Sequence, residues 1–356
     1  MIEKYEFQLF SKYLPLVSGT NRQLCESPNT AVTLRGTVGD STFVRIGELD
    51  QQLRALDLSP FGSWEIKRVY STVEIARAKL FMLKIPLTHI AGEECGTLYD
   101  ESSTCEDCGI GSRQMGPLRV AFRRLSRVRD IIRLWGGELI ASERLADLMQ
   151  TFRVSGAVLN SVIDSTYKTV VPMNLSRIPS GRELVSRATE RGVGLSGWQF
   201  FRWVHQEFQR SLWDKVLGEW KQYTEEQKNG VNSEDTEIRK RKENTIVKQN
   251  FRQIIVISRP IELAESSHFG SNPFDMSAKG SCRCAAGEIA GARPISSLVV
   301  KLASWDGSDV CQTMVYMGSR GGLFRPFQIL VVSKRFFQIL RQQEMKGFDF
   351  EVVDTI

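Results

Sequence analysis

A strand-helix-strand pattern occurs twice in this chain and limits the folds that it can adopt. The two copies cover residues 138–162 and 329–353. In each copy an apolar run leads to a serine that can cap a helix, and a glycine precedes a second apolar run. The copies align without a gap at a spacing of 191 positions, through the pairs Ser142/Ser333, Arg144/Arg335, Gly156/Gly347 and Val162/Val353. We interpret the match as a divergent internal duplication, and we expect each copy to pair its two strands in parallel through a right-handed crossover.

The stretch between the two copies has a different composition. Residues 180–192 and 198–220 predict two helices, the second of them amphipathic. Residues 225–248 are polar and charged, which is typical of an exposed linker. The 356 residues therefore predict an α+β protein of two related α/β halves with a helical insertion between them. The predicted parts are an N-terminal half at 1–175, the insertion and charged linker at 176–250, and a C-terminal half at 251–356.

A further helix is predicted before the first copy. Ser71 and Glu74 form a capping box, and a largely apolar run follows them. This pattern predicts a helix from Thr72 to Leu83 that is stopped by Pro86. Downstream, a loop rich in glycine and cysteine covers residues 92–116. The alternation of Leu118, Val120 and Phe122 then predicts a strand with arginines on its exposed face.

Composition and charge limit the possible cellular locations and partners of the chain. The chain is 42% hydrophobic and 25% charged, as in an ordinary globular protein that can bury a core. Its net charge of +6 permits an acidic protein partner or a nucleic acid but requires neither. The N-terminal residues mix charged and apolar side chains, unlike a secretory signal, and no apolar run approaches the ~20 residues that cross a bilayer. We expect a cytoplasmic protein without membrane contact.

Cysteine spacing provides the clearest chemical signal. The chain has seven cysteines, Cys25, Cys95, Cys105, Cys108, Cys282, Cys284 and Cys311. An odd number without a secretory signal argues against a disulfide framework. In the segment Cys105-Glu106-Asp107-Cys108-Gly109 two thiolates can reach one ion, and the glycine allows the tight turn that follows. Because this segment lies in a polar loop and does not begin a helix after a strand, structural zinc is favoured over a redox pair.

The remaining zinc ligands are open at this point. Cys282 and Cys284 could complete a four-thiolate site and bridge the two halves. Cys284 with Glu288 is an alternative, and so are Cys95 or His89, which are closer in sequence to Cys105. Cys282 and Cys284 could also be plain loop residues of a chain that has lost the metal, since no second Cys-x-x-Cys pair is present.

Other motifs suggest weaker alternatives. Seven arginines between Arg113 and Arg133 could bind phosphate groups. Asp306, Asp309 and Arg320 could form an acidic site, although a turn packed by a tryptophan is the commoner reading. The sequence from Gly192 to Gly197 matches G-x-G-x-x-G but follows a predicted helix, whereas a dinucleotide site needs a strand there. No HExxH, GxSxG or P-loop motif is present.

Several runs resemble the double-CxxCG-motif proteins known best from myxobacteria. The resemblance rests on CEDCGIGSRQMGPLRV, on DIIRLWGGELIASERLADLM and on the closing ILVVSKRFFQILRQQEMKGFDFEVV. It covers about residues 92–162 and 270–356, and CRCAAGE at 282–288 stands where the family has its second CxxCG. Some members of the family are immunity proteins that protect a cell from a delivered toxin. The resemblance implies a zinc-ribbon element, no catalysis and binding to a cognate toxin domain.

The sequence thus leaves three hypotheses for the function. The first is a non-catalytic, zinc-stabilised interaction protein of immunity type, with Cys105, Cys108, Cys282 and Cys284 as metal ligands. The second is a nucleic-acid-binding zinc-ribbon protein that uses the arginine-rich stretch. The third is an enzyme with an unrecognised acidic site.

Overall fold

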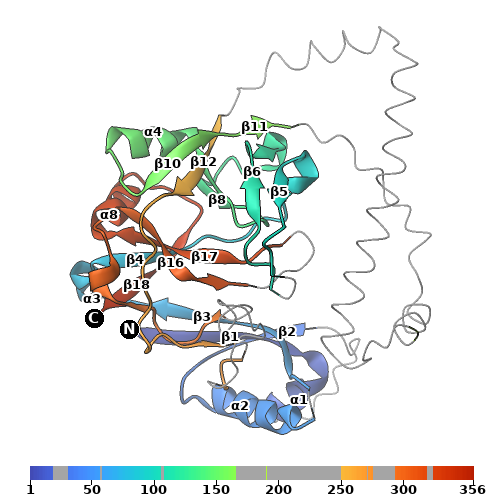
Figure 1. Ribbon diagram of the computed structural model, residues 1–356. Helices are drawn as coiled ribbons and strands as arrows, with labels where there is room; N and C mark the ends of the chain where they lie inside the picture. Colours follow the sequence, from blue (N-terminus) through green and yellow to red (C-terminus); the bar gives the residue numbers. More distant parts are fainter. Residues whose placement is uncertain are drawn as a thin grey trace.

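The computed structural model describes residues 1–18, 31–56, 58–105, 108–165, 190, 250–270, 272–275, 293–318 and 324–356. This part of the chain has a mixed α+β fold made mostly of strands, with five short α-helices and several sheets that include a curled half-barrel (Figure 1). Almost all of the predicted helical insertion lies outside the described residues, and so does the motif at 192–197. No helix in the described ranges has the length and apolar character needed to cross a membrane.

Both copies of the repeated pattern fold as strand, helix and strand. The elements of the first copy are β9 (Leu139–Ser142), α4 (Glu143–Thr151) and β10 (Ala157–Ser161). Those of the second copy are β17 (Phe327–Ser333), α8 (Lys334–Gln342) and β18 (Asp349–Thr355). The helix starts are as expected, since Ser142 Oγ accepts from the Leu145 N–H and Ser333 Oγ accepts from the Phe336 N–H.

The expected direct parallel pairing within each copy is wrong. A third strand lies between the two strands of each copy and is antiparallel to both of them. In the first copy this strand is β12 (Phe251–Val256), and in the second it is β4 (Leu80–Lys84). Two strand spacings of about 4.8 Å equal the ~10 Å width of a helix, so a crossover helix can bridge the inserted strand.

The inserted strands come from the opposite part of the sequence. Strand β4 precedes the first copy in sequence but lies in the sheet of the second, whereas β12 precedes the second copy but lies in the sheet of the first. The resulting strand orders are β10-β12-β9-β8 and β15-β18-β4-β17-β16. The outer strands are β8 (Ile131–Arg133), β15 (Val299–Val300) and β16 (Val310–Met317). Each of these two sheets therefore combines strands from before residue 165 with strands from after residue 250.

The predicted helix from Thr72 to Leu83 is correct only in its first half. Helix α3 (Thr72–Arg77) begins at the expected capping box of Ser71 and Glu74, but the apolar run that follows forms strand β4. Alternate residues of β4 enter two different cores: Phe81 and Leu83 pack in one, Leu80 and Met82 in the other. A strand buried on both faces has no polar alternation, and a short apolar run cannot be distinguished from a helix by its periodicity.

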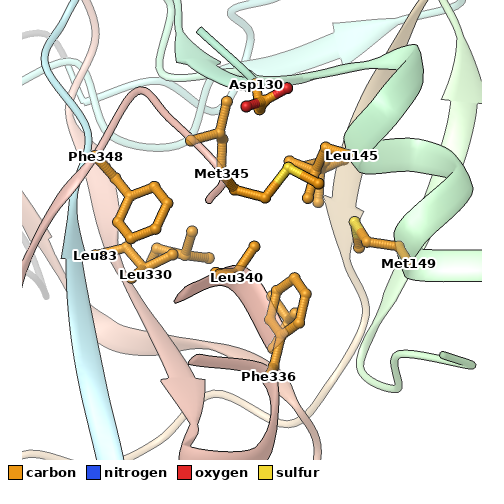
Figure 2. A pocket seen from close by; sticks show the side chains of 12 residues that line it. Leu83, Asp130, Leu145, Met149, Leu330, Phe336, Leu340, Met345 and Phe348 are labelled. Atoms are coloured by element: carbon orange, nitrogen blue, oxygen red, sulfur yellow. The ribbon is translucent and has the colours of Figure 1, made fainter. Parts of the chain in front are cut away.

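The two helices pack around a common apolar core. Figure 2 shows Leu145 and Met149 of α4 and Phe336 and Leu340 of α8 converging on a cavity of about 10 Å³. A space of that size corresponds to about one water-sized sphere and is far smaller than a ligand site. This centre of the molecule is thus a packed core.

The N-terminal region, which the sequence left unassigned, forms a separate layer below the two sheets in Figure 1. Its sheet has the order β2 (Ala31–Thr37), β1 (Ile2–Phe10) and β3 (Phe61–Val69), and the helices α1 (Leu14–Ser18) and α2 (Ser41–Arg54) accompany it. Phe274, from the second half of the chain, packs in its core, with its ring centroid 5.3 Å from that of Phe7 and 4.9 Å from that of Phe43. Asn272 donates to both oxygens of the buried Asp50 on α2. Asn272 and Phe274 therefore connect the second half of the chain to the N-terminal layer.

The remaining described strands are short and lie beside these sheets. They are β5 (Leu98–Asp100), β6 (Arg113–Met115), β7 (Arg119–Val120), β11 (Ile163–Asp164), β13 (Phe269–Gly270) and β14 (Arg293–Pro294). Of the predicted strand at Leu118, Val120 and Phe122, only β7 forms, because the chain enters a 3-10 helix at Phe122. Strands β5 and β6 pair antiparallel and carry the Cys105–Cys108 loop between them.

Candidate metal centre and the adjoining polar pocket

The Cys105–Cys108 loop is closed by its own backbone. The Cys105 N–H donates to the carbonyl of Ile110 at 2.8 Å, and the Gly109 N–H donates to the carbonyl of Cys105 at 2.8 Å. Gly109 has a φ of 79°, in the left-handed region that glycine adopts without strain. The tight turn expected after the second cysteine is therefore present.

The two thiols of this loop lie together in a very small apolar cluster. Cys108 is buried, Cys105 is half-buried, and with Ile110 they form a cluster separate from the larger cores. Two cysteines and one isoleucine bury too little apolar surface to order the loop by the hydrophobic effect alone. The donor chemistry fits half of a tetrahedral zinc site, which takes four ligands from cysteine and histidine.

The other predicted ligands are not assembled around this pair in the described part of the chain. No group of three or more His, Cys, Asp or Glu residues that could hold a metal occurs there, so neither Cys95 nor His89 joins Cys105 and Cys108. Cys282, Cys284 and Glu288 lie outside the described residues. The structure thus places the thiols of Cys105 and Cys108 in one cluster, and the other two predicted ligands, Cys282 and Cys284, lie outside the described residues.

The cysteines at 95 and 311 are core residues. Burial raises the pKa of the Cys95 thiol, and it raises the pKa of Cys311 to about 12. The Cys311 Sγ donates to the carbonyl of Val331 at 3.4 Å, inside the five-stranded sheet. A thiol that resists ionisation in an apolar core is a poor metal ligand.

A polar pocket of about 340 Å³ adjoins the cysteine loop. This volume lies within the range of small-ligand sites. Its walls come from the β5–β6 hairpin and its loop, the β8–β9 turn, and the two ends of the β16–β17 connection. The lining residues are Tyr99, Gly109, Ile110, Gly111, Ser112, Arg113, Gln114, Gly136, Glu138, Tyr316, Arg325 and Pro326.

A network of charged and phenolic groups forms one side of this pocket. The buried Arg325 donates to Glu101 at 2.7 Å and also pairs with Glu93, and its Nε donates to Ser112 Oγ at 2.9 Å. Its guanidinium also lies over the ring of Tyr99, 4.0 Å from the centroid. These contacts connect the cysteine loop to the segment that precedes β17.

Glu138 is the incompletely bonded member of the network. The Tyr99 hydroxyl donates to its Oε1, whereas its buried Oε2 has no hydrogen-bond partner among the described residues. Burial raises the pKa of this carboxyl, and it outweighs the lowering effects of the hydrogen bonds from Tyr99 and from the residue's own backbone and of the Arg325 charge; nearby Glu93 raises the pKa slightly further. The same turn places Gly136 so close that a Cβ there would overlap both carboxylate oxygens. Glycine at 136 is therefore what allows the carboxylate to fold back over the turn.

A buried arginine lies behind the same turn. Arg133 stacks on the ring of Phe327, with 4.3 Å between the guanidinium carbon and the ring centroid, and it donates to the carbonyl of Gly137. Burial lowers its pKa to about 10. Its Nε has no hydrogen-bond partner in the described part of the chain. The β8–β9 hairpin thus buries the cation Arg133 and the acid Glu138, and each has a polar atom without a hydrogen-bond partner among the described residues. Such an arrangement is typical of functional sites.

The arginine-rich stretch does not form one continuous basic face. Its exposed members are Arg113, Arg119, Arg123, Arg124 and Arg127. Arg124 pairs with Glu94 at 3.0 Å, and Arg133 is buried. The expected exposure of Arg119 and Arg123 outside the buried Leu118 and Val120 is confirmed.

The acidic residues of the second half have structural partners. Asp306 accepts from the N–H groups of Ser308 and Arg259, which fixes the turn at Gly307. A hydrogen bond from the Ser308 side chain, together with these N–H groups, lowers the pKa of Asp306. Asp309 is buried and accepts from Ser333 Oγ at 2.7 Å and from the Ser155 N–H at 3.1 Å. The turn reading of this segment is confirmed, and Arg320 lies outside the described residues.

Sequence reasoning missed Tyr99, Glu138 and Arg325 as members of one site. They are separated by 39 and 187 positions and meet where the β5–β6 hairpin, the turn before β9 and the segment before β17 line the same pocket. The available signals were the Trp135-Gly-Gly-Glu turn and the glycine- and arginine-rich segment that ends at Pro326. Comparison of the chain with protein-family models, with curated proteins and with solved structures finds no match.

Proposed function

We propose that the chain is a non-catalytic interaction protein in which zinc fixes the loop that walls the polar pocket. The observation that carries the proposal is that the buried Cys108 and the half-buried Cys105 lie together in a closed loop, in a cluster whose only other apolar member among the described residues is Ile110. A structural metal supplies the missing stabilisation in small elements of this kind. Zinc would be held by Cys105 and Cys108, with Cys282 and Cys284 as the other two ligands.

The role of the metal in this proposal is structural. Residues 109–112 follow the second cysteine directly and line the pocket. Metal bound at the thiolates would fix the backbone of residues 109–112. Because Arg325 donates a hydrogen bond to Ser112, the segment that precedes β17 would be fixed as well. A preformed surface loses less conformational entropy when a partner binds.

The zinc-dependent loop can be tested by limited proteolysis. A chelator should increase cleavage within residues 98–115 of the wild-type protein, and Cys105→Ser should show the same cleavage without chelator. Cys95→Ala is the matched control and should respond to the chelator like wild type, because Cys95 is buried and is not a member of the cluster of Cys105, Cys108 and Ile110. Equal cleavage of the loop in all samples with and without chelator would contradict the proposal.

Two related halves form part of the same proposal. We propose that the strand-helix-strand units derive from one ancestral unit whose preceding strands were exchanged. The spacing of 191 residues supports this, because it recurs in non-glycine residues with positive φ, Arg153 at 47° and Glu344 at 50°. Equivalent backbone strain at equivalent positions is unexpected for unrelated segments.

The partner in this proposal is a toxin, as the resemblance to double-CxxCG-motif proteins implies. The test is to express the chain together with the toxic product of a neighbouring gene. Protection of the cells and a stable complex on size-exclusion chromatography would support an immunity role. Unchanged toxicity with both proteins present would contradict it.

Nucleic-acid binding is a second candidate function, favoured by the exposed arginines at 119, 123 and 127. Affinity for a phosphate backbone falls steeply with salt. The double variant Arg123→Glu with Arg127→Glu should therefore lose salt-sensitive retention of DNA or RNA, whereas the exposed Arg77→Glu on α3 should not. Absence of retention by the wild-type protein at low salt would exclude this candidate.

A further inference from the structure

The polar pocket contains a carboxylate that is positioned but not satisfied. Tyr99 orients one oxygen of Glu138, Gly136 leaves the space that the carboxylate occupies, and Oε2 is left without a hydrogen-bond partner in the described part of the chain. A buried acceptor without a partner costs about 1–3 kcal/mol, so its retention needs a reason. Binding a donor group at that oxygen is such a reason.

The charges around the pocket favour a cation. The guanidinium of Arg325 is already offset by two carboxylates in contact with it, Glu93 and Glu101. Glu138 adds a third carboxylate. The charges of Arg325 and Arg133 both act on it, but Arg133 lies behind the turn and donates no hydrogen bond to it. Arg113, which also lines the pocket, lies opposite Asp100 of β5 in the backbone register, and the two side chains attract each other electrostatically.

The remaining walls suit a flat or slender organic cation. Tyr99 and Tyr316 contribute phenol rings to the wall. The backbone of residues 109–111 also lies at the wall, since Gly109 and Gly111 have no side chains. Aromatic rings attract ammonium and guanidinium groups through their negative faces. The volume of about 340 Å³ exceeds the needs of a bare ion and accommodates the end of a long side chain.

We propose that this pocket receives the guanidinium or ammonium group of an arginine or lysine side chain on the protein partner, with Glu138 as its counter-ion. The identity of the partner as a protein rests on the proposed function, whereas the cation specificity rests on the pocket alone. Binding would give Glu138 Oε2 a donor and balance the third carboxylate. Charge-assisted hydrogen bonds of this kind are about twice as strong as neutral ones.

The test uses the full chain and two probes, methylguanidinium and the peptide acetyl-Gly-Arg-Gly-amide, with acetyl-Gly-Gly-Gly-amide as the neutral control. Binding is measured by titration calorimetry and by the rise in melting temperature. We expect both cationic probes to bind wild type, with affinity reduced about tenfold or more in Glu138→Gln, which keeps an acceptor for Tyr99 but loses the charge. Gly136→Ala should weaken binding as well, because its Cβ displaces the carboxylate while every charge is retained.

The control variant is Glu65→Gln, an exposed residue of β3 with the same charge change, which should bind like wild type. Equal binding by wild type and Glu138→Gln, or no binding of either cationic probe, would overturn the proposal. Binding of methylguanidinium without the peptide would overturn the assignment to a protein side chain. Metal content and protection from the toxin are separate measurements, so failure of the proposed function and failure of this pocket are distinguishable.

Discussion

Arg335 of α8 donates a hydrogen bond to the main-chain carbonyl of Phe152, the C-cap residue that follows α4. At the equivalent position 191 residues earlier, Arg144 of α4 donates to the carbonyl of Gln343, the C-cap residue that follows α8. Each helix thus places an arginine at the C-terminal end of the other helix. The backbone carbonyls there lack partners within the helix, and the helix dipole is negative at that end. The two strand-helix-strand units hold each other by the same contact in both directions.

Two aspartates extend this reciprocal arrangement. Asp130 accepts from Ser142 Oγ at 2.9 Å and from the Lys346 N–H at 2.9 Å. Asp309 accepts from Ser333 Oγ and from the Ser155 N–H, and residues 155 and 346 are again 191 positions apart. Each carboxylate therefore connects the start of its own unit's helix to the segment after the other helix.

The reciprocal contacts are not equally strong. Arg335 forms a direct ion pair with the buried Asp309, whereas Arg144 Nη1 stays 3.7 Å from Asp130. We predict that Arg335→Ala lowers the free energy of unfolding by about 1–2 kcal/mol and that Arg144→Ala lowers it by less than about 1 kcal/mol. Urea denaturation of both variants measures the difference, and a larger loss for Arg144→Ala would contradict this ranking.

Gly156 follows α4 and Gly347 follows α8, and each lies in close contact with the backbone of another strand. Both have positive φ, 84° and 109°, and a Cβ on them would overlap the carbonyl oxygens of Val310 and Ile131. Alanine at either position should destabilise the protein by about 2–4 kcal/mol, because backbone strain and overlap with another strand add together. Gly307→Ala is the matched control: its φ is 84° with no atom within 4 Å, so it should cost only about 1 kcal/mol in denaturant unfolding. Equal losses at all three positions would show that the interstrand contacts do not matter.

Sequence reasoning located these two units well and their pairing poorly. The serine caps, the helices and the glycine breaks are local features, and Ser142, Ser333, Gly156 and Gly347 have the predicted roles. The exchange of β4 and β12 between sheets depends on contacts between distant segments, which no local pattern encodes. The same reason explains the site: the turn at Gly109 was predictable, but the meeting of Glu138 with Arg325 was not.

A buried ion pair joins the N-terminal layer to the five-stranded sheet. Arg68 on β3 donates to Glu351 on β18 at 2.8 Å, and both side chains are almost completely buried. Removing Arg68 leaves the buried Glu351 with the partly exposed Lys84, 3.1 Å away, and also removes the partner of Glu3. Arg68→Ala should therefore cost about 3 kcal/mol in the free energy of unfolding. Lys67→Ala, the neighbouring residue with an exposed cation, should cost less than about 0.5 kcal/mol. Denaturation curves of the two variants provide the comparison, and similar midpoints would contradict it.

The pH dependence of stability should show that the carboxyl of Glu138 is buried and has a raised pKa. Its pKa is raised from the ordinary value of 4.5, chiefly by burial, so the folded chain holds this proton more tightly than the unfolded chain does. The resulting stabilisation is fully present below pH 4.5 and is lost as the pH rises through the folded-state pKa. Glu138→Gln stays neutral throughout, and we therefore expect it to gain melting temperature relative to wild type between pH 4 and pH 8. A constant difference across this range would argue that the carboxylate is not buried as described.

In the function that we propose, the thiolates of Cys105 and Cys108 hold zinc. Elemental analysis of the purified protein measures this zinc directly. We predict about one zinc per wild-type chain, and a loss of most of it in the Cys105→Ser with Cys108→Ser double variant. Cys95→Ala should keep the wild-type amount. A wild-type protein purified without zinc, or a double variant that retains as much as wild type, would contradict the account.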